Sequence, residues 1–252
     1  MRPLSMLHAG SLLSALLTMG TAVAEEVLVA VASNFTAPMQ ELAEQFELES
    51  GHQVQLAFGS SGRFYAQIVN GAPYQLFFSA DQEKPRKLEE AGLSVSGSRF
   101  TYAIGSLVLW SRDRSLLVEG PEILDSNFNR LALANPELAP YGRAAVEVLE
   151  SLGKVDATRA RWVQGENIAQ TYQFVETGNA QLGFVAKSQV FSSGQLAQGS
   201  GWVIPPQLHN AIRQDAVLLN RAADCRACQA LINFIATPQA AEIIRRFGYN
   251  TD

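Results

Sequence analysis

Four segments of the chain combine hydroxyl, amide and glycine residues with almost no charge, and each precedes a helical pattern. They are Ser33-Asn34, Gly59-Ser60-Ser61-Gly62, residues 135–142 and Gly165-Glu166-Asn167. The first backbone N–H groups of a helix lack partners within the helix and carry about half an elementary positive charge. Several such ends that meet at one point, with hydroxyl and amide donors beside them, would bind an anion without lysine or arginine. One segment alone is typical of an ordinary cap or turn, so the hypothesis depends on the repetition.

Enzymatic chemistry finds less support in the sequence. Ser61 lies in Gly-Ser-Ser-Gly-Arg, which departs from the GxSxG nucleophile pattern because arginine occupies the fifth position. The sequence contains neither a Walker A motif nor GxGxxG. His52 and His209 lack metal-ligand spacing, and nothing brings Asp81 and Glu166 together as a general acid and base. We therefore expect no catalytic residue and no cofactor, and an exported hydrolase with Ser61 as nucleophile stays an alternative.

Short apolar runs alternate with helical patterns, which is typical of α/β architecture with largely parallel sheets. The expected strands are 27–32, 54–58, 75–80, 102–111 (a strand or a crossover), 131–134, 182–186 and 216–219. The expected helices contain residues 39–46, 64–69, 144–152, 168–175, 231–235 and 240–247. The pattern restarts after residue 111 without a flexible linker, which indicates two lobes joined by crossing segments. Ligands of such sheets bind outside the carboxyl ends of the strands, where the four polar segments lie.

Composition excludes several classes of protein. Of the 252 residues, 47% are hydrophobic and 17% are charged, as in ordinary globular proteins and unlike disordered or fibrous chains. The formal net charge of -5 argues against a nucleic-acid binder, because such proteins neutralise phosphates with Lys and Arg. We expect no nucleic-acid partner and a monomer.

The first 24 residues have the features of a secretory signal peptide. A short positive start is followed by a mostly apolar stretch over 4–19, and Ala22-Val23-Ala24 is a small-residue cleavage site. We expect cleavage after Ala24 and export to the periplasm. Removal of this segment, which holds one Arg and no acidic residue, changes the net charge from -5 to -6.

Cys225 and Cys228 form the only Cys-x-x-Cys pair in the sequence. Export to an oxidising compartment favours a structural disulfide. Two free thiols and a redox motif stay open as alternatives, although the thioredoxin-like context of a strand directly before the pair is missing. A four-cysteine zinc site is excluded because a second pair is absent.

The chain from Val27 to Tyr249 resembles the ModA family, the molybdate-binding proteins of bacterial ABC importers, which are type II periplasmic binding proteins. The stretches that carry the resemblance are VAVASNF (29–35), FGSSG (58–62), LFFSAD (76–81), ANP (134–136) with PYGRAA (140–145), GENI (165–168) and LGFV (182–185). Together these stretches are specific, whereas any one of them would be weak.

The resemblance implies two α/β lobes, each a mostly parallel sheet flanked by helices. Lobe 1 would comprise residues 25–104 and 213–252, and lobe 2 residues 105–212. The family captures molybdate or tungstate in the cleft and delivers it to a membrane ABC permease. Molybdenum would be held only as its oxyanion, without direct protein ligands.

The resemblance also implies the ligand-binding residues. Lobe 1 would supply the side chains or N–H groups of Ser33 and Asn34, and the hydroxyl and N–H of Ser61. Lobe 2 would supply the backbone N–H groups of Tyr141 and Ile168. A fully deprotonated tetrahedral dianion accepts hydrogen bonds and donates none, so a site made of donors suits it.

Two positions depart from the family pattern. Ala186 stands where some members place a tyrosine hydroxyl on the ligand, and we expect Asn34 to compensate. Gln75 stands where the family usually has an aspartate. A binder of another tetrahedral oxyanion such as sulfate stays an alternative that differs in cleft size. A ferric-ion binder would need clustered Tyr, His and carboxylate ligands, and the polar segments offer mainly Tyr141.

Overall fold

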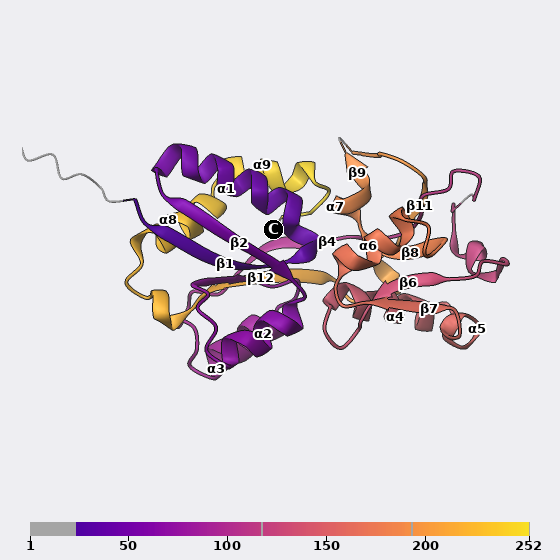
Figure 1. Ribbon diagram of the computed structural model, residues 1–252, viewed down its shortest axis with the longest axis horizontal. Coiled ribbons are helices and arrows are strands. Elements are labelled where there is room, and N and C mark those ends of the chain that lie inside the picture. Colours follow the sequence, from indigo (N-terminus) through magenta and orange to yellow (C-terminus); the bar gives the residue numbers. More distant parts are fainter. Residues whose placement is uncertain (1–23, 117, 193, 252) are drawn as a thin grey trace, which may run out of the picture.

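The computed structural model describes residues 24–116, 118–192 and 194–251, and residues 1–23 of the predicted signal peptide lie outside the described residues. The described chain forms two lobes, each a sheet with helices packed on it (Figure 1). Lobe 1 contains β1 (Glu26–Ala32), β2 (Gln53–Gly59), β3 (Leu76–Phe78), β4 (Phe100–Gly105), β12 (Ile212–Leu218), α1 (Thr36–Ser50), α2 (Ser61–Val69), α3 (Glu83–Glu90), α8 (Arg226–Ile235) and α9 (Pro238–Arg246).

Lobe 2 is built from the middle of the chain. It contains β5 (Leu107–Ser111), β6 (Leu131–Ala134), β7 (Trp162–Gly165), β8 (Leu182–Ala186), β9 (Phe191–Ser192), β10 (Gln195–Leu196), β11 (Ser200–Val203), α4 (Pro140–Ser151), α5 (Val155–Arg159), α6 (Ile168–Glu176) and α7 (Lys187–Val190). Short 3-10 helices add η1 (Ser33–Phe35), η2 (Pro121–Asp125), η3 (Pro206–Leu208) and η4 (Asn220–Ala222).

The two sheets share one pattern of strand directions. Within the described residues the strand orders are β2-β1-β3-β12-β4 and β11-β5-β8-β6-β7. In each sheet one strand runs against the other four: β12 in lobe 1 and β5 in lobe 2. These are the strands that the chain enters directly after it crosses from the other lobe. The other strands of both sheets therefore end at the boundary between the lobes, and the loops that follow them face each other there.

The lobe 1 core follows from the alternation of residues along β1. Val27, Val29 and Val31 pack in one cluster with residues of α1, α8 and α9. Ala30, on the opposite face, packs in a second cluster with residues of α2 and α3. A buried strand that is covered on both faces needs apolar residues at consecutive positions, which explains its continuous apolar sequence. Helices on both faces of the sheet complete the expected α/β layering (Figure 1).

Most elements lie where the sequence predicts them, and β6 and β8 match residue for residue. The apolar run 102–111 is not one strand, because it divides at Ser106 into β4 and β5, which belong to different lobes. Helix α3 was not predicted, since its sequence is mostly charged and its buried residues, Lys84, Pro85 and Leu88, do not form an apolar helical pattern. Strands β7 and β11 were also missed because their short sequences show no alternation.

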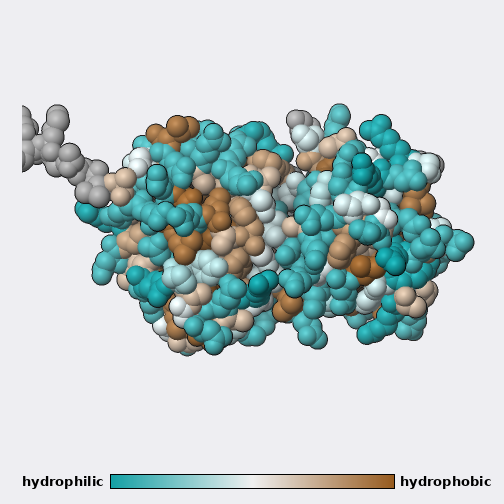
Figure 2. Space-filling model, in the orientation of Figure 1, coloured by the Kyte–Doolittle hydropathy of each residue, from teal (hydrophilic) through white to brown (hydrophobic). Residues whose placement is uncertain are grey.

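The surface in Figure 2 is hydrophilic over most of the visible face of both lobes, and hydrophobic residues gather on lobe 1 over β2. Strand β2 is an edge strand whose Val54, Leu56 and Phe58 pack partly against the core. Among the described residues, the helices are all too short or too polar to cross a membrane.

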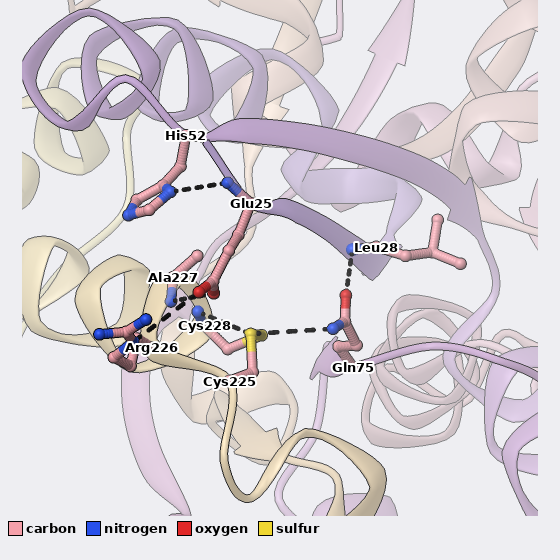
Figure 3. Close-up of a disulfide and its surroundings, with 8 residues drawn as sticks. All are labelled: Glu25, Leu28, His52, Gln75, Cys225, Arg226, Ala227 and Cys228. Carbon is pink, nitrogen blue, oxygen red and sulfur yellow. Dashed lines mark hydrogen bonds and ion pairs between the residues drawn. A yellow bond between two sulfur atoms is a disulfide. The ribbon is translucent and has the colours of Figure 1, made fainter. Parts of the chain in front are cut away.

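Cys225 and Cys228 form a disulfide at the start of α8, with a Cα–Cα distance of 5.3 Å (Figure 3). The Glu25 carboxylate accepts a hydrogen bond from the N–H of Ala227 (3.1 Å) in the same helical turn. The disulfide and Glu25 thus fix the first turn of α8 beside the start of β1. The structural disulfide that the sequence favours is present.

Replacing both cysteines by serine is expected to lower the free energy of unfolding by roughly 2 kcal/mol, because the disulfide closes a loop of only four residues. Urea unfolding of the variant and of the oxidised protein would measure this difference. Reduction of the unmodified protein with dithiothreitol serves as the matched condition. A loss above about 5 kcal/mol would show that the disulfide does more than restrict the unfolded chain.

Candidate functional site

A small cavity of about 10 Å³ lies between the lobes, at the ends of the strands that meet there. This is close to the space of a single water-sized sphere, so the lobes enclose the cavity tightly. All five residues predicted for the site line it: Ser33, Asn34, Ser61, Tyr141 and Ile168. Their exposed fractions are all 6% or less. The structure thus brings together residues from both lobes that lie up to 135 positions apart in the sequence.

Helix α2 leaves one N–H of its first turn for the cavity. The Ser60 hydroxyl caps the helix and accepts from the Arg63 N–H (3.4 Å). The Gly62 N–H donates across the lobe boundary to the Leu138 carbonyl (2.8 Å). Among the described hydrogen bonds, the Ser61 N–H is the donor of this turn without a partner, and Ser61 lines the cavity.

Helix α4 also leaves one N–H of its first turn unpartnered, because it begins with a proline. Pro140 occupies the first helical position and has no N–H. The next two N–H groups after Tyr141, those of Gly142 and Arg143, both donate to the Ala139 carbonyl (2.9 and 3.2 Å). In the described hydrogen bonds this leaves the Tyr141 N–H without a partner, and it is the group that the family resemblance implies for the ligand. Proline at this position is a signal that sequence reasoning could have used.

Helix α6 repeats the arrangement with an asparagine cap. The Asn167 side-chain oxygen accepts from the N–H groups of Ala169 and Gln170 (3.0 Å each). The Ile168 N–H comes first in the helix, so no helical carbonyl lies four residues before it. Three helices from two lobes therefore each present one N–H, and a partial positive charge, to the same cavity.

The Ser61 hydroxyl adds a further donor. Its oxygen accepts a hydrogen bond from the Ala80 N–H (2.9 Å). Because a hydroxyl has one proton, this contact fixes the oxygen as an acceptor and frees the proton for donation into the cavity. The Ser33 hydroxyl makes none of the described hydrogen bonds, while the Ser33 carbonyl accepts from Thr36 (2.9 Å).

Asn34 does not compensate with its side chain in the way that we expected. Its amide nitrogen donates to the Gln214 side-chain oxygen (2.7 Å) and to the Tyr249 hydroxyl (3.0 Å). Both amide hydrogens are thus used by lobe 1, so any donation by Asn34 into the cavity must come from its backbone N–H. Ala186, the position with the absent tyrosine, is buried at the end of β8.

Behind Asn34 lies a buried polar cluster that the sequence did not reveal. Gln214 is fully buried and bonds Asn34, the Tyr102 hydroxyl (3.0 Å) and the Tyr141 hydroxyl (3.4 Å). Tyr141 belongs to lobe 2, so the cluster crosses the lobe boundary. Burial raises the pKa of the Tyr102 and Tyr141 hydroxyls well above the ordinary value, and it raises the pKa of Tyr249 to about 12. All three hydroxyls are therefore neutral near pH 7.

Charged residues occur at the rim of the cleft rather than in the cavity lining. Arg63 in lobe 1 pairs with Glu166 in lobe 2 at 3.2 Å, and both side chains are exposed. Arg143 in lobe 2 pairs with Glu83 in lobe 1 at 3.1 Å. Hydrogen bonds from Lys87 and then Arg143 lower the pKa of Glu83 to about 2. Exposed pairs of this kind contribute about 0–1 kcal/mol each, so they make only a small contribution to holding the two lobes together.

Other groups with possible chemistry lie apart from the cavity. The Gln75 side chain accepts from the Leu28 N–H (2.8 Å) and lies 3.7 Å from the Cys225 sulfur, next to the disulfide (Figure 3). His52 accepts from the Glu25 N–H (3.1 Å) in the same region. In the part of the chain that the structure describes, no group of three or more His, Cys, Asp or Glu residues could hold a metal ion.

Two lobes that enclose a cavity of hydrogen-bond donors define a solute-binding protein. Over residues 27–250 the chain matches the family described as "Bacterial extracellular solute-binding protein". It is 52% identical over 227 residues to the molybdate-binding protein ModA of Azotobacter vinelandii, a match that covers 90% of each chain. It is 46% identical over 231 residues to ModA of Rhodobacter capsulatus, with 92% of this chain and 90% of the other covered.

A solved structure agrees with these relatives. The Azotobacter vinelandii periplasmic molybdate-binding protein superposes with a TM-score of 0.86 at 40% identity, over 90% of this chain and 99% of that chain. The chain belongs to the bacterial extracellular solute-binding proteins and, within them, to the ModA family. The predicted family and two-lobe fold are thereby confirmed, and so is the expectation that the chain is a binding protein rather than an enzyme.

Alkaline pH is expected to destabilise the fold through the buried tyrosines. The pKa of a tyrosine in an unfolded chain is about 10, whereas the pKa of Tyr249 in the folded protein is about 12. Its stabilising contribution is therefore complete below about pH 10 and is lost as the pH rises through 12. Between about pH 9 and 11, the Tyr249→Phe variant should lose about 1 kcal/mol less stability than the unmodified protein. Urea unfolding at several pH values measures how the stability of both proteins falls with pH, and Tyr65→Phe at a partly buried position is the control. An equal fall for Tyr249→Phe and the unmodified protein would contradict the expectation.

Proposed function

We propose that the protein captures molybdate between its lobes and delivers it to the membrane permease of an ABC importer. The observation that carries this proposal is the set of three unpartnered N–H groups, one each on α2, α4 and α6, together with the Ser61 hydroxyl. They converge on a cavity whose lining within the described residues holds no charged side chain. Such a site binds a dianion through oriented dipoles, so the negative net charge of the chain is compatible with the function.

The donors favour a fully deprotonated ligand. Each of the groups that we assign to the ligand donates a hydrogen bond, so a protonated anion would leave its own hydrogen without an acceptor. We assign to the ligand the N–H groups of Ser61, Tyr141 and Ile168, the hydroxyls of Ser33 and Ser61, and the backbone N–H of Asn34. Tungstate has the same charge and shape as molybdate and fits the same donors. Sulfate is smaller, and its hydrogen bonds in a cavity closed around molybdate would be longer and weaker.

Further parts of the proposal concern the cell and the chain. The solved structure of the Azotobacter vinelandii relative is named periplasmic, which supports a periplasmic location after export. Cleavage after Ala24 rests on the small-residue sequence Ala22-Val23-Ala24. The receiving partner would be a membrane permease. We propose residues 25–104 with 213–252 as lobe 1 and residues 105–212 as lobe 2. Each of these boundaries falls one residue inside a strand of the lobe 1 sheet, because β4 ends at Gly105 and β12 begins at Ile212. The protein would act as a monomer without a nucleic-acid partner.

Molybdate should stabilise the ligand-free mature protein by about 2.7 kcal/mol at one hundred times the dissociation constant. Thermal unfolding with molybdate, tungstate and sulfate, followed by competition calorimetry, gives the order of affinities. The proposal predicts that sulfate binds more weakly than molybdate and tungstate. A tighter constant for sulfate would reassign the ligand, and no stabilisation by any of the three would refute oxyanion capture.

Gly62→Ala is expected to weaken molybdate binding by about tenfold, mainly through faster dissociation. A Cβ at this position would lie 2.9 Å from the Leu138 carbonyl oxygen of the opposite lobe, so the lobes could not close fully. Stopped-flow tryptophan fluorescence would measure the rate, with Ala66→Ser on the exposed part of the same helix as control. If Gly62→Ala binds as tightly as the control, the closed arrangement is not the bound state.

A further inference from the structure

Helix α7 connects the two halves of the candidate site. It follows β8 directly, contains only Lys187–Val190, and lies on the side of lobe 2 that faces lobe 1 (Figure 1). Two neighbouring side chains on it, Ser188 and Gln189, contact the backbone of one site residue in each lobe. Neither side chain lines the cavity, so neither belongs to the proposed set of ligand donors.

The Ser188 hydroxyl reaches lobe 1. It donates to the Asn34 carbonyl at 2.8 Å and lies 3.0 Å from the Tyr249 hydroxyl. The same carbonyl also accepts from Tyr249 at 2.6 Å. Both acceptor positions of the Asn34 carbonyl are thus filled, one from within lobe 1 and one from lobe 2. Separation of the lobes would break the Ser188 contact and leave the Tyr249 contact intact.

The Gln189 amide holds the lobe 2 half of the site. Its nitrogen donates to the Ile168 carbonyl at 3.0 Å, and its oxygen accepts from the Ala186 N–H at 2.9 Å. These two bonds tie the first residue of α6 to the start of α7. The position of Ser188 is therefore fixed relative to the Ile168 N–H that we assign to the ligand.

Helix α7 also packs directly against the backbone of lobe 1. The stem of Lys187 packs on Gly248 of lobe 1, where a Cβ would lie 3.1 Å from the lysine side chain. Gly248 has a φ of 82°, in the left-handed region that glycine adopts without strain. The backbone of lobe 1 thus approaches α7 closely beside Tyr249.

We propose that Ser188 and Gln189 are positioning residues for oxyanion capture. By holding Asn34 and Ile168 from adjacent positions on one short helix, they make lobe closure and the alignment of the donors a single event. The inference rests on the proposed function, because it concerns the same ligand site. Ala186 stands where some family members place a tyrosine hydroxyl on the ligand, and we propose no side chain that replaces this hydroxyl. Helix α7 begins at the next residue and acts on the backbone of the site residues instead.

The test compares Ser188→Ala with Ser188→Thr, which keeps the hydroxyl, and with Ser192→Ala, an exposed serine on the same lobe. Calorimetry with sodium molybdate gives the affinity, stopped-flow tryptophan fluorescence gives the dissociation rate, and urea unfolding gives the stability of the ligand-free protein. Loss of this partly buried hydrogen bond should weaken binding by about five- to tenfold through faster dissociation. We expect the lobes to separate without ligand and to lose this contact, so the stability of the ligand-free protein should not change, and threonine should restore tight binding.

Gln189→Leu removes the lobe 2 half and is expected to reduce affinity by a similar factor. Unchanged affinity in Ser188→Ala or Gln189→Leu would overturn the inference. It would also be overturned if Ser188→Ala lowered the stability of the ligand-free protein by as much as it lowered the free energy of molybdate binding. If the unmodified protein itself fails to bind molybdate, the proposed function fails instead. The two failures are thus distinguishable in one set of measurements.

Discussion

An anion enclosed in a protein loses its water, and hydrogen-bond donors must replace that water from every side. This requirement explains why the two sheets meet with their strand ends facing each other. Strand ends lead into helices, and the helices begin with N–H groups that lack carbonyl partners. The lobes therefore place α2, α4 and α6 around one cavity, and a ligand there completes hydrogen bonds that the protein alone leaves open.

Local sequence decides which N–H of each helix stays open. In α2, a serine cap and a hydrogen bond across the lobes occupy the other N–H groups of the first turn. In α4 the first residue is a proline without an N–H, and in α6 an asparagine cap occupies the following N–H groups. The three solutions differ in chemistry and agree in outcome. The residues that cap these helices in the ordinary way thus also determine which single N–H stays available for a ligand. No charged side chain in the cavity is needed for this.

Much of the fold could be predicted because the strands are continuous apolar runs and the helices have apolar faces, as in β1 and α1. Helix α3 escaped prediction because its sequence is almost entirely charged. The five candidate site residues were predicted through the family resemblance that local motifs carry, and they line one cavity. Gln214, Tyr249 and Ser188 were not, because they meet Asn34 only in the folded chain, 154 to 215 positions away. The Asn34 side chain shows most clearly what sequence alone does not predict. An asparagine amide could donate to a ligand, but in the fold it donates to Gln214 and Tyr249 instead.

The double crossing of the chain has a consequence for the order of folding. Lobe 2 is formed by one continuous stretch, so its contacts can be made as soon as that stretch is available. Lobe 1 is not continuous: β12, from near the end of the chain, lies between β3 and β4 in the middle of its sheet. Its sheet cannot be completed until residues 212–218 arrive, and this pairing of distant segments makes lobe 1 the slower lobe to form. For an exported protein, a lobe that depends on the last part of the chain stays incomplete until the whole chain is available.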